Sequence, residues 1–346
     1  MVAVGADVGT GVTASPGFRL SVLDRSRTRE GEEPARALRA TVAFAVEAER
    51  LGYHRFWVSE HHGVPGVAGS APTVLAAAVA AATSRIRVGT GGVMLPNHQP
   101  LVVAEQFGVL AALFPGRIDM GLGRSVGFTD GVRRALGREK DAADRFPEQI
   151  AELLSYFDTT ARSHRDVHAR PAEGLDVPAF VLATGAGADV AAEAGLPLVI
   201  AAVRGEEAML AAIDRYRERF RPSARADRPY VVVSGTVAVA GTEERARTLL
   251  VPEAWASAHT RTHGEFPPLA PAERILARPM SPRERTEFDR ALTGHIAGTP
   301  DRAAGELAAL MERTGADEFL LTTSTYDRAE QSASYRLLAE AVGLSA

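Results

Sequence analysis

The sequence predicts an α/β fold, a single (β/α)8 TIM barrel with a loop insertion before the last strand. Short apolar runs alternate with longer amphipathic segments about eight times along the chain. Most of these runs are nearly continuous in Val, Ile, Leu and Phe, as strands buried on both faces should be. The length of 346 residues suits one barrel domain, although a doubly wound open sheet is the alternative. We expect residues 1–17 to form a disordered leader and residues 18–346 to form the barrel.

The predicted strands are the short apolar runs of this pattern. In chain order, they are Phe18–Leu23, Arg55–Ser59, Ile86–Gly92, Ile118–Leu122, Ala179–Ala183, Leu198–Ala201, Tyr230–Ala240 and Glu318–Thr322. In a (β/α)8 barrel the carboxyl ends of all strands meet at one mouth. The residues that follow each run are therefore the candidates for a functional site.

The predicted helices lie between these strands and carry apolar residues at helical spacing. Pro100 suits the first turn of its helix, and Gly52 suits the cap that ends the first helix. In chain order, the helices are Glu33–Leu51, Pro72–Ala82, Pro100–Leu113, Phe146–Phe157, Ala188–Ala194, Glu206–Phe220, Pro300–Thr314 and Asp327–Val342. The segment Pro252–Arg283 is rich in proline and weakly periodic, so we expect a mobile lid or a disordered loop there.

The composition excludes several classes of protein. The chain has no cysteine, which excludes disulfides, thiolate catalysis, iron–sulfur clusters and cysteine-bound zinc. A net charge of −4 gives no reason to expect nucleic acid as a partner. Lys140 is the only lysine and follows Glu139, so the chain has no P-loop. We also expect no membrane partner and a cytoplasmic location, because the sequence shows neither a long uncharged apolar stretch nor a signal peptide.

Glycines and one arginine follow the third, fourth and fifth strands. Gly91 and Gly92 would weaken a strand, so they indicate either a backbone that lies against a ligand, such as a flat ring, or tight barrel packing. Arg124 is a permanent cation at the mouth, where it suits a phosphate or carboxylate, with a surface ion pair as the alternative. The stretch Thr184–Val190 joins a strand to a helix and could hold an anion with its backbone N–H groups.

Glu60, His61 and His62 follow the second strand directly. Adjacent strand residues point to opposite faces, so the two histidines would not share one ligand, and no third ligand is spaced to help them. The sequence therefore predicts no metal site. Glu60 or one imidazole that points into the mouth would act as an acid, a base or a hydrogen-bond donor. The alternative is a histidine that only caps the next loop.

Four stretches resemble the bacterial luciferase-like flavin-dependent monooxygenases: "RLSVLD", "ERLGYHRFWVSEHHG", "IRVGTGGVMLPNHQPLVVAEQFGVL" and "RIDMGLGR". The resemblance covers nearly the whole chain from Arg19 onward. It implies a homodimer formed through early helices, with reduced FMN as a diffusible cosubstrate that a flavin reductase supplies. It also implies that O2 and the reduced FMN oxidise a small organic substrate.

The resemblance also implies roles for single residues. His61, preceded by Glu60, matches the catalytic histidine of the family. Gly91–Gly92, preceded by Thr90, matches a non-proline cis peptide behind the isoalloxazine ring. The remaining matches form the phosphate site, and they are Arg124, Ala183, Thr184 and Gly187.

Two departures from the family pattern affect cofactor binding. Many relatives have a serine-rich turn after strand five, where this chain has Thr184 and, with no side chain, Gly187. The end of strand six, "IAAVRG", lacks the polar or aromatic residues often seen there. The missing hydroxyl predicts weak FMN binding, in the micromolar range or weaker. Two other functions stay open, a deazaflavin-dependent hydride-transfer oxidoreductase and a non-catalytic flavin-binding or partner subunit.

Overall fold

A computed structural model describes residues 17–160 and 163–345. The expected leader, residues 1–17, therefore lies outside the described residues except for Gly17. Parallel strands pair in the order β3-β2-β1-β11-β8-β7-β6-β5, and pairing of β3 with β5 closes the barrel, which excludes the open sheet. Their bounds are β1 (Arg19–Asp24), β2 (Arg55–Val58), β3 (Arg87–Thr90), β5 (Ile118–Gly123), β6 (Ala179–Ala183), β7 (Leu198–Ala201), β8 (Val231–Gly235) and β11 (Glu318–Leu321).

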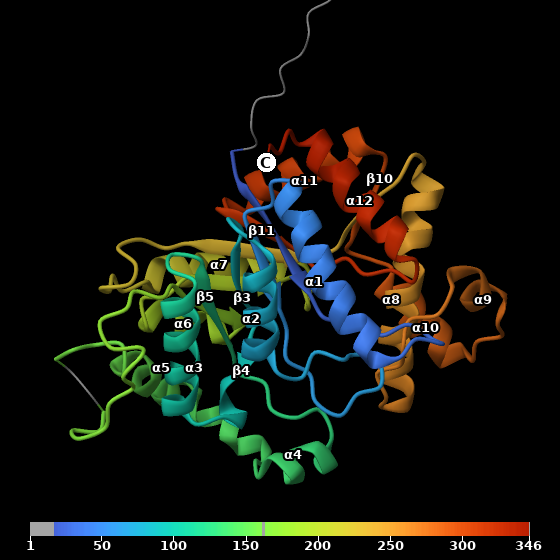
Figure 1. Cartoon of the computed structure of the whole chain (residues 1–346). Coiled ribbons are helices and arrows are strands. Elements are labelled where there is room, and N and C mark those ends of the chain that lie inside the picture. The colour runs from blue at the N-terminus through green and yellow to red at the C-terminus, as the bar shows by residue number, and fades with distance from the viewer. Residues whose placement is uncertain (1–16, 161–162, 346) are drawn as a thin grey trace, which may run out of the picture.

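Helices surround this barrel (Figure 1). The helices that connect barrel strands are α1 (Pro34–Arg50), α2 (Pro72–Ala82), α3 (Pro100–Leu113), α4 (Asp130–Leu136), α5 (Phe146–Ser155), α6 (Gly187–Glu193), α7 (Glu206–Arg219) and α11 (Pro300–Thr314), and α12 (Arg328–Ala341) follows the last strand. Short 3-10 helices occupy η1 (Leu95–Asn97) and η2 (Lys140–Arg145). Among the described residues, no helix has the length and apolar character needed to cross a bilayer.

The third and seventh predicted strands are each interrupted. After β3 the chain passes through Gly91 and Gly92 and continues as β4 (Val93–Met94), which pairs with the end of β5. The run Tyr230–Ala240 splits into β8 and β9 (Val237–Val239), and β9 leaves the barrel to pair with β10 (Ile296–Gly298). Ser234, Gly235 and Thr236 interrupt this otherwise apolar run, and they mark the point where the chain leaves the barrel.

The insertion before the last strand is helical, so the loop expected over Pro252–Arg283 is wrong. It folds as α8 (Glu243–His263), α9 (Ala272–Ala277) and α10 (Pro282–Ala291), which Figure 1 shows together on one side of the barrel. Pro252 lies buried inside α8. A satellite core that includes Trp255, Ile275 and Phe288 joins the three helices. Burial of these apolar side chains stabilises the helices even though proline removes a backbone donor.

A buried ionic network fills the barrel at the amino ends of its strands. Arg55 on β2 places Nη1 2.7 Å from Asp119 Oδ2 and Nε 3.0 Å from Glu318 Oε1. Asp119 also accepts from Arg87 Nε at 2.9 Å, and Glu318 accepts from the Tyr230 hydroxyl at 2.8 Å. Burial would lower the pKa of Arg55, but the two carboxylates raise it above its ordinary value. Because this network fills the amino end of the barrel, a functional site within the barrel can form only at the carboxyl end.

We expect Asp119→Ala to destabilise the fold by about 3–5 kcal/mol, because it leaves buried Arg55 without one of its carboxylates. Asp119→Asn should also destabilise it, since the shape is kept and the charge is lost. Denaturant unfolding monitored by circular dichroism measures the change. Glu340→Ala is the control, because it breaks only the exposed Arg336–Glu340 pair of α12 and should cost less than about 1 kcal/mol. Similar losses in both variants would contradict the role given to this network.

Candidate active site

A cavity of about 960 Å³ opens at the carboxyl ends of the barrel strands. It brings together most of the predicted site residues, and these are Glu60, His61, Gly91, Gly92, Arg124, Ala183, Thr184 and Gly187. Thr90 lies behind the cavity wall instead. It is buried, and its hydroxyl donates to the Gly121 carbonyl at 2.8 Å. Thr90 therefore ties β3 to β5 rather than reaching the cavity through its side chain.

The floor of the cavity is bare backbone. The Gly91–Gly92 peptide is cis, which confirms the sequence prediction of a non-proline cis bond there. A Cβ on Gly91 would lie 2.6 Å from a Leu23 methyl, and one on Gly92 would lie 2.8 Å from the Gly121 carbonyl oxygen. Tight barrel packing thus excludes side chains at both positions. Both glycines also line the cavity beside Leu23 and Leu320, so a flat ring could rest against an apolar floor.

His61 lies in the loop after β2 and lines the cavity. Its Nδ1 is 3.1 Å from the Ser59 hydroxyl, and its ring centroid is 6.2 Å from that of Phe266, which follows α8. Among the described residues no partner binds its Nε2. Burial, reinforced by the positive charges of Arg25 and Arg27, lowers the pKa of His61 to about 4. The imidazole is therefore neutral at neutral pH.

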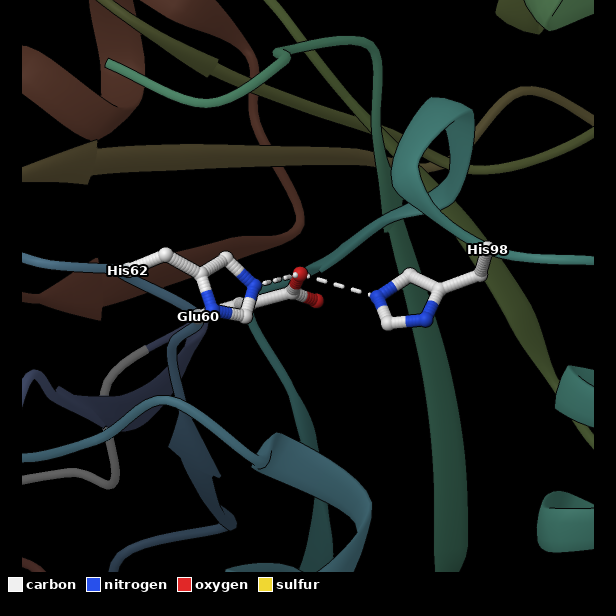
Figure 2. A group of neighbouring side chains, drawn as sticks. All are labelled: Glu60, His62 and His98. Atoms are coloured by element: carbon white, nitrogen blue, oxygen red, sulfur yellow. Dashed lines mark hydrogen bonds and ion pairs between the residues drawn. The ribbon is translucent and has the colours of Figure 1, made fainter. Parts of the chain in front are cut away.

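Glu60 stands between two imidazoles from different loops (Figure 2). His62 Nε2 and His98 Nε2 both donate to Glu60 Oε1, at 2.7 and 2.8 Å, and the Met94 backbone N–H donates to Oε2 at 2.9 Å. Burial alone would raise the pKa of Glu60, but hydrogen bonds from His62 and His98 lower it to about 2. The Glu60 side chain is thus an ionised carboxylate, and both of its oxygens accept hydrogen bonds. In this geometry Glu60 is an acceptor that ties the loop after β2 to β4.

The same three side chains have ligand atoms within 4.8 Å of one another, a spacing that could hold a metal ion. His61 is not part of this group, as expected for adjacent residues that point to opposite faces, but the expectation that no further ligand lies nearby is wrong, because His98 joins His62 and Glu60. A histidine that binds a metal usually donates its other ring N–H to an outer acceptor. The described part of the chain provides no such acceptor for Nδ1 of His62 or His98. We therefore interpret the group as a hydrogen-bonding network around Glu60.

Charged and small residues occupy the wall formed after β5, β6 and β7. Arg124 donates to the Ala143 carbonyl at 3.0 Å and forms an ion pair with Asp144 at 2.8 Å, which is the surface ion pair that the sequence left open as an alternative. Arg124 also lines the cavity. Arg204 also lines this wall, although its stretch of sequence seemed to lack useful polar groups. Arg204 lies three residues after β7, and this position at the carboxyl end of a strand could have marked it as a candidate site residue.

The rest of the lining is largely apolar. Met94 of β4, Val126 and Phe128 of the loop after β5, and Phe266 after α8 come from three different segments around the mouth. Such a lining suits an organic substrate with an apolar part.

Comparison with known proteins agrees with this geometry. The model of the luciferase-like monooxygenase family matches residues 18–318. The N-acetyl-S-alkylcysteine monooxygenase of Bacillus subtilis is 36% identical over 332 residues, which cover 94% of this chain and 98% of that protein. The crystal structure of apo-MsnO8 superposes with a TM-score of 0.85 at 34% identity, and the match covers 95% of this chain and 98% of that one.

Two more distant structures share the fold and differ in cofactor. The oxygenating constituent of 3,6-diketocamphane monooxygenase from Pseudomonas putida, in complex with FMN, has a TM-score of 0.70 at 19% identity and covers 94% of this chain and 97% of its own. An F420-dependent secondary alcohol dehydrogenase has a TM-score of 0.69 at 17% identity and covers 94% of this chain and 99% of its own. These likenesses show the fold alone.

We expect Arg25→Ala to raise the pKa of His61 from about 4, because the substitution removes a nearby positive charge. An NMR titration of labelled imidazoles measures this pKa, with His61→Gln to assign the signal and Arg336→Ala as a remote control. In the folded protein His61 is buried as a neutral imidazole with a pKa of about 4, whereas in the unfolded chain its pKa is about 6.5. As the pH drops from about 6.5 toward 4, the unfolded chain binds a proton that the folded protein does not, and the free energy of unfolding therefore falls. A wild-type pKa near 6.5, or no rise in Arg25→Ala, would refute this electrostatic account.

Proposed function

Because the chain belongs to the luciferase-like monooxygenase family, we propose that it is a two-component flavin-dependent monooxygenase. It uses reduced FMN, delivered by a separate flavin reductase, and O2 to oxidise a small organic substrate in the cytoplasm. The observation that carries the proposal is one cavity with a neutral histidine, a bare glycine floor and an arginine on its wall.

The residues present fit the two chemically distinct parts of FMN. The backbone of Gly91 and Gly92 offers a flat surface to the ring, and Arg124 with the Thr184 hydroxyl offers charge and hydrogen bonds to the phosphate. When bound, reduced flavin supplies the electrons that activate O2. The chain itself binds and orients the reactants and excludes water.

His61 lines the cavity in which the flavin and substrate would bind. The Ser59 hydroxyl lies 3.1 Å from Nδ1 of this cavity-lining side chain, and Nε2 has no partner among the described residues. Glu60 keeps the neighbouring loop in place through its bonds to His62 and to the Met94 amide. His61 is thus the proposed catalytic residue, and Glu60 is a positioning residue.

Deazaflavin-dependent hydride transfer is the second candidate, supported by the shared fold with the F420-dependent alcohol dehydrogenase. Titrations with FMN, reduced FMN and deazaflavin separate the two. Tighter binding of reduced FMN supports the monooxygenase. A preference for deazaflavin would replace it with hydride transfer, and flavin binding without any turnover would favour a non-catalytic subunit.

We expect His61→Gln to keep the fold and flavin affinity and to lower substrate oxidation about 100-fold or more, because the flexible amide would not hold a hydrogen bond where the fixed imidazole does. The assay supplies reduced FMN and O2 to a panel of thioethers, aldehydes and ketones and measures oxidised product. His62→Gln is the matched control, whose side chain bonds to Glu60, and it should affect loop order more than the reaction. Substrate oxidation at the wild-type rate in His61→Gln would contradict the catalytic role proposed for His61.

The proposal includes a homodimer formed through α2 and α3. Val102, Val109 and Leu113 lie on one face of α3 and are 45%, 47% and 65% exposed, and Val74 of neighbouring α2 is 69% exposed. A stripe of large apolar side chains on two packed helices suits a second copy of the chain.

Leu113→Glu should therefore convert the dimer to a monomer, because it would bury a charge in the apolar interface. Light scattering after size-exclusion chromatography measures the mass. Leu276→Glu is the control, since Leu276 is 53% exposed on α9, away from this face. A wild-type monomer, or a Leu113→Glu dimer, would rule out this interface.

A further inference from the structure

Arg204 reaches the cavity from the loop after β7. It lines the same wall as Arg124 and Thr184. Its Nη1 lies 3.9 Å from the point where a Cβ on Gly185 would sit, so the guanidinium packs over the glycine turn that follows β6. The family resemblance implies a cofactor phosphate at this turn and assigns no role to Arg204.

No acid among the described residues pairs with Arg204. Two neighbouring arginines differ in this respect, because Arg215 and Arg219 lie 3.6 and 3.4 Å from Asp189. Those two cations are already neutralised in part. The positive charge of Arg204 is free for an anion that enters the cavity.

The turn beneath Arg204 cannot supply side-chain hydroxyls of its own beyond Thr184. A Cβ on Gly187 would lie 2.8 Å from the Ala183 methyl, so a serine there would clash. Gly185 has a φ of +69°, which disfavours any side chain. A phosphate at this wall therefore needs a partner that comes from another segment.

Charge balance points to the same residue. A phosphate monoester carries roughly −1.5 to −2 charges near neutral pH. Arg124 shares its single charge with Asp144 at 2.8 Å. We propose that Arg204 is a second phosphate-binding arginine, which replaces the missing hydroxyl at Gly187 with a stronger, charge-assisted contact. This inference rests on the proposed flavin-dependent function, and it implies tighter FMN binding than the missing hydroxyl alone predicts.

Titrations of FMN and riboflavin with the wild type and with Arg204→Ala test the proposal, because riboflavin lacks the phosphate. FMN affinity should fall about 10- to 100-fold, and riboflavin affinity should stay within about twofold. Arg204→Lys should restore part of the FMN affinity, since it keeps the charge and loses the planar fork. Arg39→Ala, an exposed arginine on α1 that does not line the cavity, is the matched control and should change neither affinity.

Two results would overturn the inference while wild-type FMN binding stands. One is unchanged FMN affinity in Arg204→Ala, and the other is an equal loss for FMN and riboflavin. If FMN affinity were unchanged but an anionic substrate bound more weakly, Arg204 would belong to the substrate site instead. A wild type that binds no flavin or deazaflavin would overturn the proposed function and this inference together. Circular dichroism of each variant shows whether the fold is kept.

Discussion

The barrel depends on one buried cation, Arg55, held between carboxylates of two other strands. Asp119 on β5 and Glu318 on β11 are almost fully buried, so each charge is stable only while its partners are in place. A slip in register on any of these three strands would leave a buried charge alone. The network thus favours a single pairing of the strands. It also fills the amino end of the barrel with polar groups, which leaves the carboxyl end for the cavity.

A second buried arginine joins the helical insertion to the site. Arg27 places Nε 2.8 Å from Glu253 of α8, donates to the Gly66 carbonyl at 2.9 Å, and stacks 4.4 Å from the Phe266 ring centroid. Burial lowers its pKa to about 10, so it remains charged at neutral pH. The loop that carries His61 and the segment after α8 are therefore held against each other. The insertion is a packed wall of the cavity, with Phe266 as its face toward His61.

Local sequence patterns were enough to predict the barrel, but they could not predict the features that depend on tertiary contacts. The strands and main helices follow from apolar periodicity, which is a property of neighbouring residues. Pro252 argues against a helix locally, but burial around Trp255 and Phe288 overrides it. At the site, Glu60, His61 and Arg124 could be found because they follow strands directly. His98 reaches Glu60 across 38 residues of sequence, and Arg204 lies over a turn that belongs to a different strand, so no spacing rule reveals either contact.

The charges around His61 also decide how it can act in the proposed reaction. A general base works best when its pKa is near the working pH. Burial and the nearby arginines lower the pKa of His61 to about 4, which makes it a weak base at neutral pH. The same environment keeps the ring uncharged and fixes its orientation through Ser59. His61 is therefore suited to hydrogen bonding as a neutral imidazole rather than to abstracting a proton. Because this pKa lies well below neutrality, that character persists across neutral and mildly alkaline pH.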